Sequence, residues 1–260
     1  MIETTITDDI AQVTLARPEK KNALAFEMFD ALTKAARDLA NTDGLRAVVI
    51  SGQGGAFCAG LDLGTMQSMA TKMDEVKASL TEVDATGANR FQSPVTAWAH
   101  VPVPVIAAVD GVCLGAGMQL ALGCDFRVVH PDTQMSVMEA KWGLVPDMGI
   151  TQSLPKLMRA DQAKLLIMSA RTFSGSEAAG MGLVTELSDT PMDAAMAIAH
   201  DLATRSPQSL AGGKALVERA WGGGPDALAL EAALQRDLIG SPNQIESVMA
   251  NMQKRAPKFG

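Results

Sequence analysis

Two glycine-rich turns are the parts of this sequence best suited to chemistry. The first turn, Gly52–Gly60, follows the apolar run Val48–Ile50, and the second, Asp110–Gly117, follows Val105–Val109. Small residues let a ligand approach the backbone closely, and the first N–H groups of a following helix have no internal partner and lie at its positive end. Two such ends aimed at one point would form an oxyanion hole. Small residues also serve the packing of a strand against a helix, so spacing alone leaves both interpretations open.

The sequence lacks the spacing or the residue types that several other common functional sites require. The two turns lack the third glycine of a dinucleotide-binding loop, since Phe57 and Leu120 stand in its place, and Leu61 replaces the lysine of a P-loop. The sequence has no Gly-x-Ser-x-Gly elbow. Cys58 has no histidine nearby in sequence to activate it, and the histidines themselves are scattered, at His100, His130 and His200. We therefore expect neither a metal nor a redox cofactor.

The elements that would carry these turns alternate between strand and helix. Short apolar runs at 47–50, 105–109 and 126–129 predict strands covered on both faces. Residues 2–7 and 10–16 predict a hairpin turning at Asp8-Asp9, and the apolar spacing from Phe26 to Leu39 predicts a helix. Helical patterns dominate after residue 150. The sequence therefore predicts an α/β core over 1–190 and a helical region over 191–260.

Composition limits the partners. The 260 residues carry 22 Lys+Arg and 29 Asp+Glu, a formal charge of −7, which argues against a nucleic-acid-binding protein. The beginning of the chain lacks the pattern of a signal peptide, and no apolar stretch is long enough to span a membrane. The odd number of cysteines, at 58, 113 and 124, cannot form a full disulfide set. These features predict a cytoplasmic protein with no membrane partner.

Several motifs, in order along almost the whole chain, resemble the crotonase (enoyl-CoA hydratase/isomerase) family. The segment Gly55–Leu63 is similar to that family's first oxyanion motif, and Asp110–Gly117 followed by Cys124-Asp125 is similar to its second. The other similar segments are Arg17–Leu24, Glu139, Gly143-Leu144, Pro146, Leu154-Pro155, Phe173–Ala178, Gly182–Val184 and Lys254–Phe259.

The resemblance implies a crotonase-like spiral core of ββα repeats with a helical C-terminal trimerisation part. It implies an acyl-CoA thioester as the substrate and a homotrimer or dimer of trimers as the assembly. By position, the backbone N–H groups of Ala59 and Ala116 would hold the thioester oxygen of an enolate. The family's usual residue at the second position is glycine, but Ala116 keeps the N–H.

The resemblance also places the CoA moiety. The segment Ala59-Gly60-Leu61-Asp62 would line it. Local positive charge near an anionic ligand matters in a protein of net charge −7. The candidates for its phosphates are Arg17, Lys20 and Lys21, and Lys254 and Lys258 of the tail.

The acid/base positions decide which reaction is expected. Hydratases of the family use two glutamates to activate water, and the first of these positions holds Gln119, whose amide cannot act as a general base. The second position keeps Glu139. Dienoyl-CoA isomerases place another carboxylate eight residues later, as Asp147 lies here, although they also carry Asp where Gln119 stands. Asp147 could alternatively cap a turn or a helix.

The sequence therefore predicts an enzyme that isomerises the double bonds of enoyl-CoA or dienoyl-CoA. Glu139 would abstract a proton and Asp147 would return or stabilise one at the far end of the acyl chain. One alternative is an enoyl-CoA hydratase, a lyase. Another, from a different class, is a non-catalytic acyl-CoA-binding or assembly protein.

Overall fold

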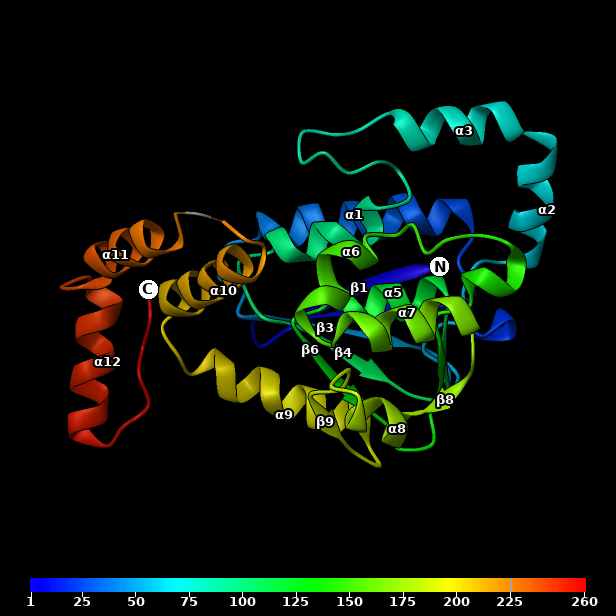
Figure 1. Cartoon of the computed structure of the whole chain (residues 1–260). Helices are drawn as coiled ribbons and strands as arrows, with labels where there is room; N and C mark the ends of the chain where they lie inside the picture. Colours follow the sequence, from blue (N-terminus) through cyan, green and yellow to red (C-terminus); the bar gives the residue numbers. More distant parts are fainter. Residues whose placement is uncertain (225) are drawn as a thin grey trace.

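A six-stranded sheet forms the centre of the molecule (Figure 1). The structure is a computed structural model that describes residues 1–224 and 226–260, without the side chains of residues 69 and 70. The strand order is β1-β2-β3-β4-β6-β9. Only the first pair is antiparallel within this sheet, and Asp8 and Asp9, both at positive φ, close its hairpin as predicted. The strands span Ile2–Thr7, Ile10–Leu15, Ala47–Gly52, Val105–Val109, Phe126–Val129 and Glu186–Leu187, in the order given.

A smaller sheet stands beside the first. It consists of β5 (Val112–Leu114), β7 (Gln134–Ser136) and β8 (Phe173–Ser174) in the order β5-β7-β8. The chain passes from β4 directly into β5 and then into helix α5 (Ala116–Leu122), and from β6 into β7. An isolated bridge from Cys58 to Cys113 continues the small sheet toward the first turn. The predicted repeat of two strands and a helix is therefore present.

Helices cover both faces of the large sheet, which explains why its strands are apolar throughout. Val48 and Ile50 of β3 belong to the core under α1, whereas Ala47 and Val49 belong to a second core under α9. In that second core α9 contributes small alanines, and Figure 1 shows α1 and α9 on opposite sides of the sheet. The helices are α1 Phe26–Ala40, α2 Leu63–Thr71, α3 Met73–Thr81, α4 Ser93–Thr96, α5 (above), α6 Ile150–Ser153, α7 Ala160–Ser169, α8 Gly175–Gly180, α9 Pro191–Ala203, α10 Pro207–Trp221, α11 Ala227–Leu238 and α12 Pro242–Gln253, with 3-10 turns η1 Pro18–Lys20, η2 Ala97–His100, η3 Glu139–Trp142 and η4 Leu154–Lys156.

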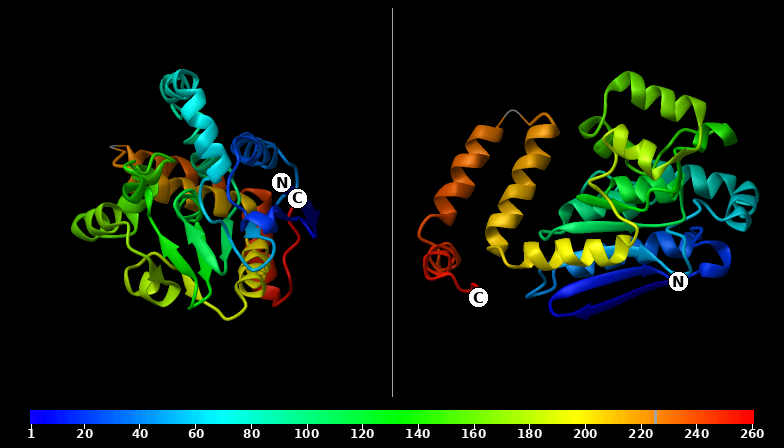
Figure 2. Two further views of the ribbon diagram at one scale, coloured as in Figure 1. Left: turned by 90° about the vertical axis from the view of Figure 1, so that its right-hand side faces the viewer. Right: turned by 90° about the horizontal axis from the view of Figure 1, so that it is seen from below.

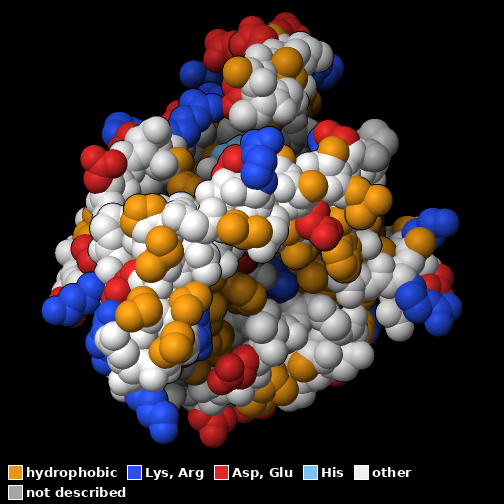
Figure 3. All heavy atoms as spheres, turned by 90° about the vertical axis from the view of Figure 1, so that its left-hand side faces the viewer, with side chains coloured by type: hydrophobic (Ala, Val, Ile, Leu, Met, Phe, Trp, Pro, Cys, Tyr) orange, Lys and Arg blue, Asp and Glu red, His pale blue; other side chains and the backbone are white. Residues whose placement is uncertain are grey.

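The C-terminal helices form a separate arm (Figure 2). Because α9 packs on the sheet, the arm begins with α10. The predicted boundary between the core and the helical region, at residue 190, stays a prediction. A largely buried ion pair between Lys214 Nζ and Asp125 Oδ2, 2.7 Å apart, ties α10 to the core. Figure 3 shows hydrophobic side chains on the side of the molecule where this arm lies. Within the arm, the side chains of Trp221, Leu228 and Met252 are exposed. Within the described residues, no helix is long and apolar enough to cross a membrane.

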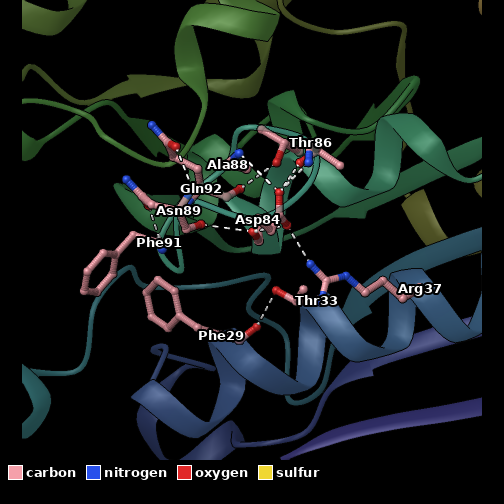
Figure 4. A network of polar contacts seen from close by, with 11 residues as sticks. Phe29, Thr33, Arg37, Asp84, Thr86, Ala88, Asn89, Phe91 and Gln92 are labelled. Carbon is pink, nitrogen blue, oxygen red and sulfur yellow. Dashed lines mark hydrogen bonds and ion pairs between the residues drawn. The ribbon is translucent and has the colours of Figure 1, made fainter. Parts of the chain in front are cut away.

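The segment between β3 and β4 leaves the body of the molecule as α2 and α3 and returns through a loop fastened to α1 (Figure 4). Asp84 organises this loop. One of its carboxylate oxygens accepts hydrogen bonds from the Thr86 N–H and hydroxyl, and the other accepts from Arg37 Nη2 at 2.6 Å. The hydrogen bonds from Thr86, followed by those from the Ala88 N–H and the Ser93 hydroxyl, lower the pKa of Asp84 from 3.8 to about 2.

We expect Asp84→Asn to lower the free energy of unfolding by about 1 kcal/mol at pH 6, after allowing for solvent screening of a partly exposed group. Since the folded-state pKa lies below the unfolded one, the contribution is present above pH 3.8 and is lost as the pH falls toward 2. Urea unfolding at pH 6 and at pH 3 measures this difference, with Asp43→Asn as an exposed control. A difference from the wild type that is the same at both pH values would contradict the assignment.

Candidate active site

Residues of the segment 17–24 form hydrogen bonds with the first glycine-rich turn. The buried Asn22 side chain donates from Nδ2 to the carbonyls of Gln53 and Ala56, at 2.9 and 2.7 Å, and its Oδ1 accepts from the Arg17 N–H. Sequence reasoning missed Asn22 as a determinant of this turn. The signal that could have found it is an asparagine directly ahead of an apolar pair, at a break where its amide could replace missing backbone partners.

The same segment determines which N–H groups of the turn are free. Leu24 donates to the carbonyl of Gly60 at 2.7 Å and accepts from the N–H of Asp62 at 3.0 Å, which leaves the intervening Leu61 N–H without an acceptor among the described residues. The Ala59 N–H instead donates to the Lys21 carbonyl at 2.9 Å. The prediction that Ala59 supplies a donor for an oxyanion is therefore wrong in this structure, because its hydrogen is already engaged. Of these two N–H groups, the one that remains available among the described residues is that of Leu61.

The second turn brings the Ala116 N–H to the same point. Ala116 is the first residue of α5, so its N–H has no partner inside the helix. A Cβ placed on Gly60 would lie 3.9 Å from the Ala116 nitrogen and 3.0 Å from the Leu114 carbonyl oxygen, and Gly60 has a φ of +97°. Glycine is therefore needed at position 60 for two reasons, and the backbones of the two turns meet there. Together the Leu61 and Ala116 N–H groups can hold one oxygen atom.

A carboxylate lies beside this meeting point. Glu139 begins η3, and its Oε1 lies 3.6 Å from the position that a Cβ on Gly115 would occupy. That oxygen accepts from Gln119 Nε2 at 2.7 Å, whereas Oε2 is buried and has no partner among the described residues. Burial raises the pKa of Glu139, and the nearby Asp147 raises it further. Glu139 is thus a half-buried carboxyl group with one free oxygen.

The charge of Asp147 acts on Glu139, so the two predicted acids lie within electrostatic range of each other. The Asp147 residue is exposed to solvent. The surrounding protein nevertheless removes part of the hydration of its carboxyl group, which raises the pKa of Asp147. Two carboxyl groups with raised pKa values, beside two free N–H groups, form an arrangement suited to moving protons on a carbonyl compound.

Comparison with known proteins agrees with this geometry. The enoyl-CoA hydratase/isomerase family model matches residues 5–260. The chain belongs to this family. It is 31% identical over 256 residues to the peroxisomal Delta(3,5)-Delta(2,4)-dienoyl-CoA isomerase of Arabidopsis thaliana, covering 96% of this chain and 92% of that one. It is also 31% identical to the mitochondrial methylglutaconyl-CoA hydratase of Mus musculus, covering 96% and 79%. An enoyl-CoA hydratase structure from Polaromonas sp. JS666 superimposes with a TM-score of 0.89 at 30% identity, covering 100% and 99% of the two chains.

The expected enoyl-CoA hydratase/isomerase fold, a mixed α/β core with a helical C-terminal region, is therefore confirmed. The buried cysteines take no part in the chemistry of the site. Burial raises the pKa of the Cys58 thiol to about 12, so it stays protonated and is a poor nucleophile. Within the described residues, no group of three His, Cys, Asp or Glu side chains could hold a metal ion.

Of the basic residues predicted to contact CoA, some lie near the candidate active site and others lie far from it. Lys20 and Lys21 are exposed beside the first turn. Arg17 lies there too, but its guanidinium pairs with Asp62 at 3.2 Å. Asp62 in turn caps α2 by accepting from the Thr65 N–H at 3.0 Å, the contact that contributes most to lowering the pKa of Asp62. Arg17 and Asp62 thus brace the turn.

The tail lysines lie elsewhere. Phe259, next to Lys258, packs its ring 5.3 Å from the Arg46 guanidinium. Arg46 precedes β3, whereas Gly60 follows the opposite end of that strand. The C-terminus and α2 accordingly lie on opposite sides of the molecule (Figures 1 and 2). Within one chain the tail therefore lies away from Lys20 and Lys21, and the role of Lys254 and Lys258 at a CoA site stays a prediction.

Proposed function

We propose that this member of the enoyl-CoA hydratase/isomerase family isomerises the double bond of an enoyl-CoA or dienoyl-CoA. The observation that carries the proposal is the composition of the site: Glu139 has a neutral amide, Gln119, as its hydrogen-bond partner, and its nearest acidic neighbour is Asp147. Addition of water by a pair of glutamates needs a second carboxylate where Gln119 stands. An isomerisation needs only groups that move protons.

In the proposed reaction the Leu61 and Ala116 N–H groups bind the thioester oxygen. Glu139 Oε2 removes a proton from C2 of a 3,5-dienoyl-CoA, and the electron pair spreads over the conjugated enolate. Asp147, which burial makes easier to protonate than a free aspartate because it raises the pKa, gives a proton to C6 and leaves the 2,4-diene. One proton leaves the acyl chain and one returns, and exchange of protons with solvent then restores the ionised Glu139 and the protonated Asp147. For a 3-enoyl-CoA, Glu139 alone would carry the proton from C2 to C4.

The similarity to a named dienoyl-CoA isomerase supports this proposal, and the similarity to a named methylglutaconyl-CoA hydratase supports the alternative, hydration. Assays of the purified protein on 3,5-dienoyl-CoA, trans-3-enoyl-CoA and crotonyl-CoA separate the two. We expect conversion of at least one of the first two substrates and slow hydration of the third. Fast hydration of crotonyl-CoA without isomerisation would overturn the proposal. Binding of CoA thioesters with no turnover of any would support a non-catalytic binding protein.

We further propose a homotrimer or a dimer of trimers as the working form. The exposed apolar side chains of the α10–α12 arm support this, because a large apolar face on a protein surface marks an interaction site. In such an assembly Lys258 could serve the CoA site of a neighbouring copy, which its position within one chain does not allow. The cytoplasmic location also stays a prediction.

Lys20 and Lys21 are proposed to contact the CoA phosphates. We expect the double variant Lys20→Gln/Lys21→Gln to raise the KM for an acyl-CoA about threefold to tenfold, because each exposed ion pair contributes a few tenths to one kcal/mol. The kcat should stay within a factor of about two, since neither side chain touches the reacting atoms. Lys34→Gln, on the exposed face of α1, is the control. A KM equal to that of the wild type at low salt would rule out the contact.

A further inference from the structure

Gln119 connects the carboxyl group of Glu139 to the backbone next to Asp147 through a single side chain. Its Nε2 donates to Glu139 Oε1 at 2.7 Å, and its Oε1 accepts from the backbone N–H of Met148 at 2.9 Å. Met148 directly follows Asp147 in the chain. Gln119 is itself buried in α5 and therefore makes both contacts away from water.

The direction of these hydrogen bonds is fixed by chemistry. A backbone N–H can only donate, so the amide oxygen must face Met148 and the NH₂ group must face Glu139. Glu139 Oε1 must then act as an acceptor, which its ionised form does best. The buried Oε2 has no partner among the described residues, and it is the oxygen left for a substrate proton. The amide thus distinguishes the two carboxylate oxygens.

We propose that Gln119 is a positioning residue that holds Glu139 by Oε1 and the Asp147 segment by the Met148 N–H, so that Glu139 presents Oε2 to the substrate. This inference rests on the proposed role of Glu139 as the proton carrier. It assigns a function to the residue that replaces a hydratase glutamate: the amide keeps two nearby acids apart and oriented, rather than acting on water.

The charges around Glu139 make this amide important. Asp147 is the acidic neighbour that raises its pKa, and α5 carries no charged side chain. Lys141, on η3 with Glu139, lies over the Trp142 ring, with Nζ 5.9 Å from the ring centre. Helix α7 packs against η3 and carries Asp161 and Lys164, both exposed to solvent. Among these side chains, Gln119 is the hydrogen-bond donor that favours the ionised form of Glu139.

The variant Gln119→Glu tests the role directly. It keeps an acceptor for Met148 but sets a carboxylate where the donor was, and two carboxylates at hydrogen-bond distance cannot both ionise easily. The acid limb of the pH–rate profile should therefore move up by more than about one unit, which lowers the rate by about tenfold or more at pH values well below the wild-type limb. The KM should change less than about threefold. The substrate is the thioester that the wild type converts fastest, and Gln235→Glu is the control for an added charge.

A second variant and a second readout keep the test independent of activity. Gln119→Met is nearly isosteric and removes both contacts without adding charge. We expect it to lower kcat about tenfold to a hundredfold through misplacement of Glu139. Titration of the ¹³C-labelled Glu139 carboxyl by NMR should show a raised pKa in both variants, even if the wild type turns over no thioester. Absence of turnover of any thioester by the wild type would overturn the proposed function but not the positioning role. Unchanged Glu139 titration and unchanged pH profiles in both variants would overturn the positioning role.

Discussion

Replacement of Glu139 by glutamine is expected to lower the kcat for isomerisation by about 10²–10⁴-fold, the usual contribution of a general acid/base group. The amide oxygen of the Glu139→Gln variant could still accept from Gln119 Nε2, so the local structure should persist. The new side chain could not take a proton from the acyl chain, because an amide is not a base at ordinary pH. The KM should change little, since the N–H groups of Leu61 and Ala116 remain, as do Lys20 and Lys21 beside the first turn. Steady-state kinetics measure both parameters, with Glu231→Gln on the exposed face of α11 as the matched control.

The stability of this variant distinguishes a catalytic group from a structural one. The pKa of Glu139 is raised in the folded protein, so the folded state binds more protons than the unfolded state between the two pKa values, and stability falls as the pH rises through that interval. Removing the charge should therefore leave the variant at least as stable as the wild type at pH 7. Any gain should shrink as the pH falls below the ordinary glutamate range. Loss of activity together with a large loss of stability would instead indicate that Glu139 supports the fold.

The sequence was sufficient for those features that depend on residue type and order. Runs such as Val105–Val109 are apolar at every position because helices cover both faces of the sheet, and that pattern can be read without coordinates. The acids Glu139 and Asp147 were identified through the resemblance to the crotonase family. In the structure Glu139 begins the 3-10 turn η3, and the charge of Asp147 contributes to raising the pKa of Glu139.

Features that depend on hydrogen-bond direction could not be predicted. Ala59 and Leu61 both lie in a turn rich in small residues, and only the pairing of Leu24 with Gly60 and Asp62 shows which N–H is free. Gln119 could be recognised as unable to act as a base, but its contact with Met148 spans 29 residues and has no local signature. The position of Lys258 could not be predicted for a similar reason, because the path of the tail depends on the packing of Phe259 against Arg46.

The choice between Ala59 and Leu61 can be decided by removing single N–H groups. Incorporation of an α-hydroxy acid replaces one backbone N–H by an ester oxygen and keeps the side chain. We expect this change at Leu61 or at Ala116 to lower kcat about 10²–10³-fold, the usual cost of losing one donor from an oxyanion hole. The effect should fall mainly on kcat, because the charge on the oxygen develops fully only in the enolate.

The same replacement at Ala59 provides the matched control. It breaks the hydrogen bond to the Lys21 carbonyl, so it should cost about 1 kcal/mol of stability, the typical contribution of one such bond. The kcat should stay within about tenfold of the wild type, because the Ala59 N–H faces Lys21 rather than the substrate. A loss of about 10²-fold or more at Ala59, with little effect at Leu61, would show that the turn rearranges when substrate binds. Leu61 would then lose its place in the oxyanion hole. A large loss of kcat at Leu61 with little effect at Ala59 would show that the oxyanion hole is already formed before substrate binds, by the contact of Gly60 with the second turn.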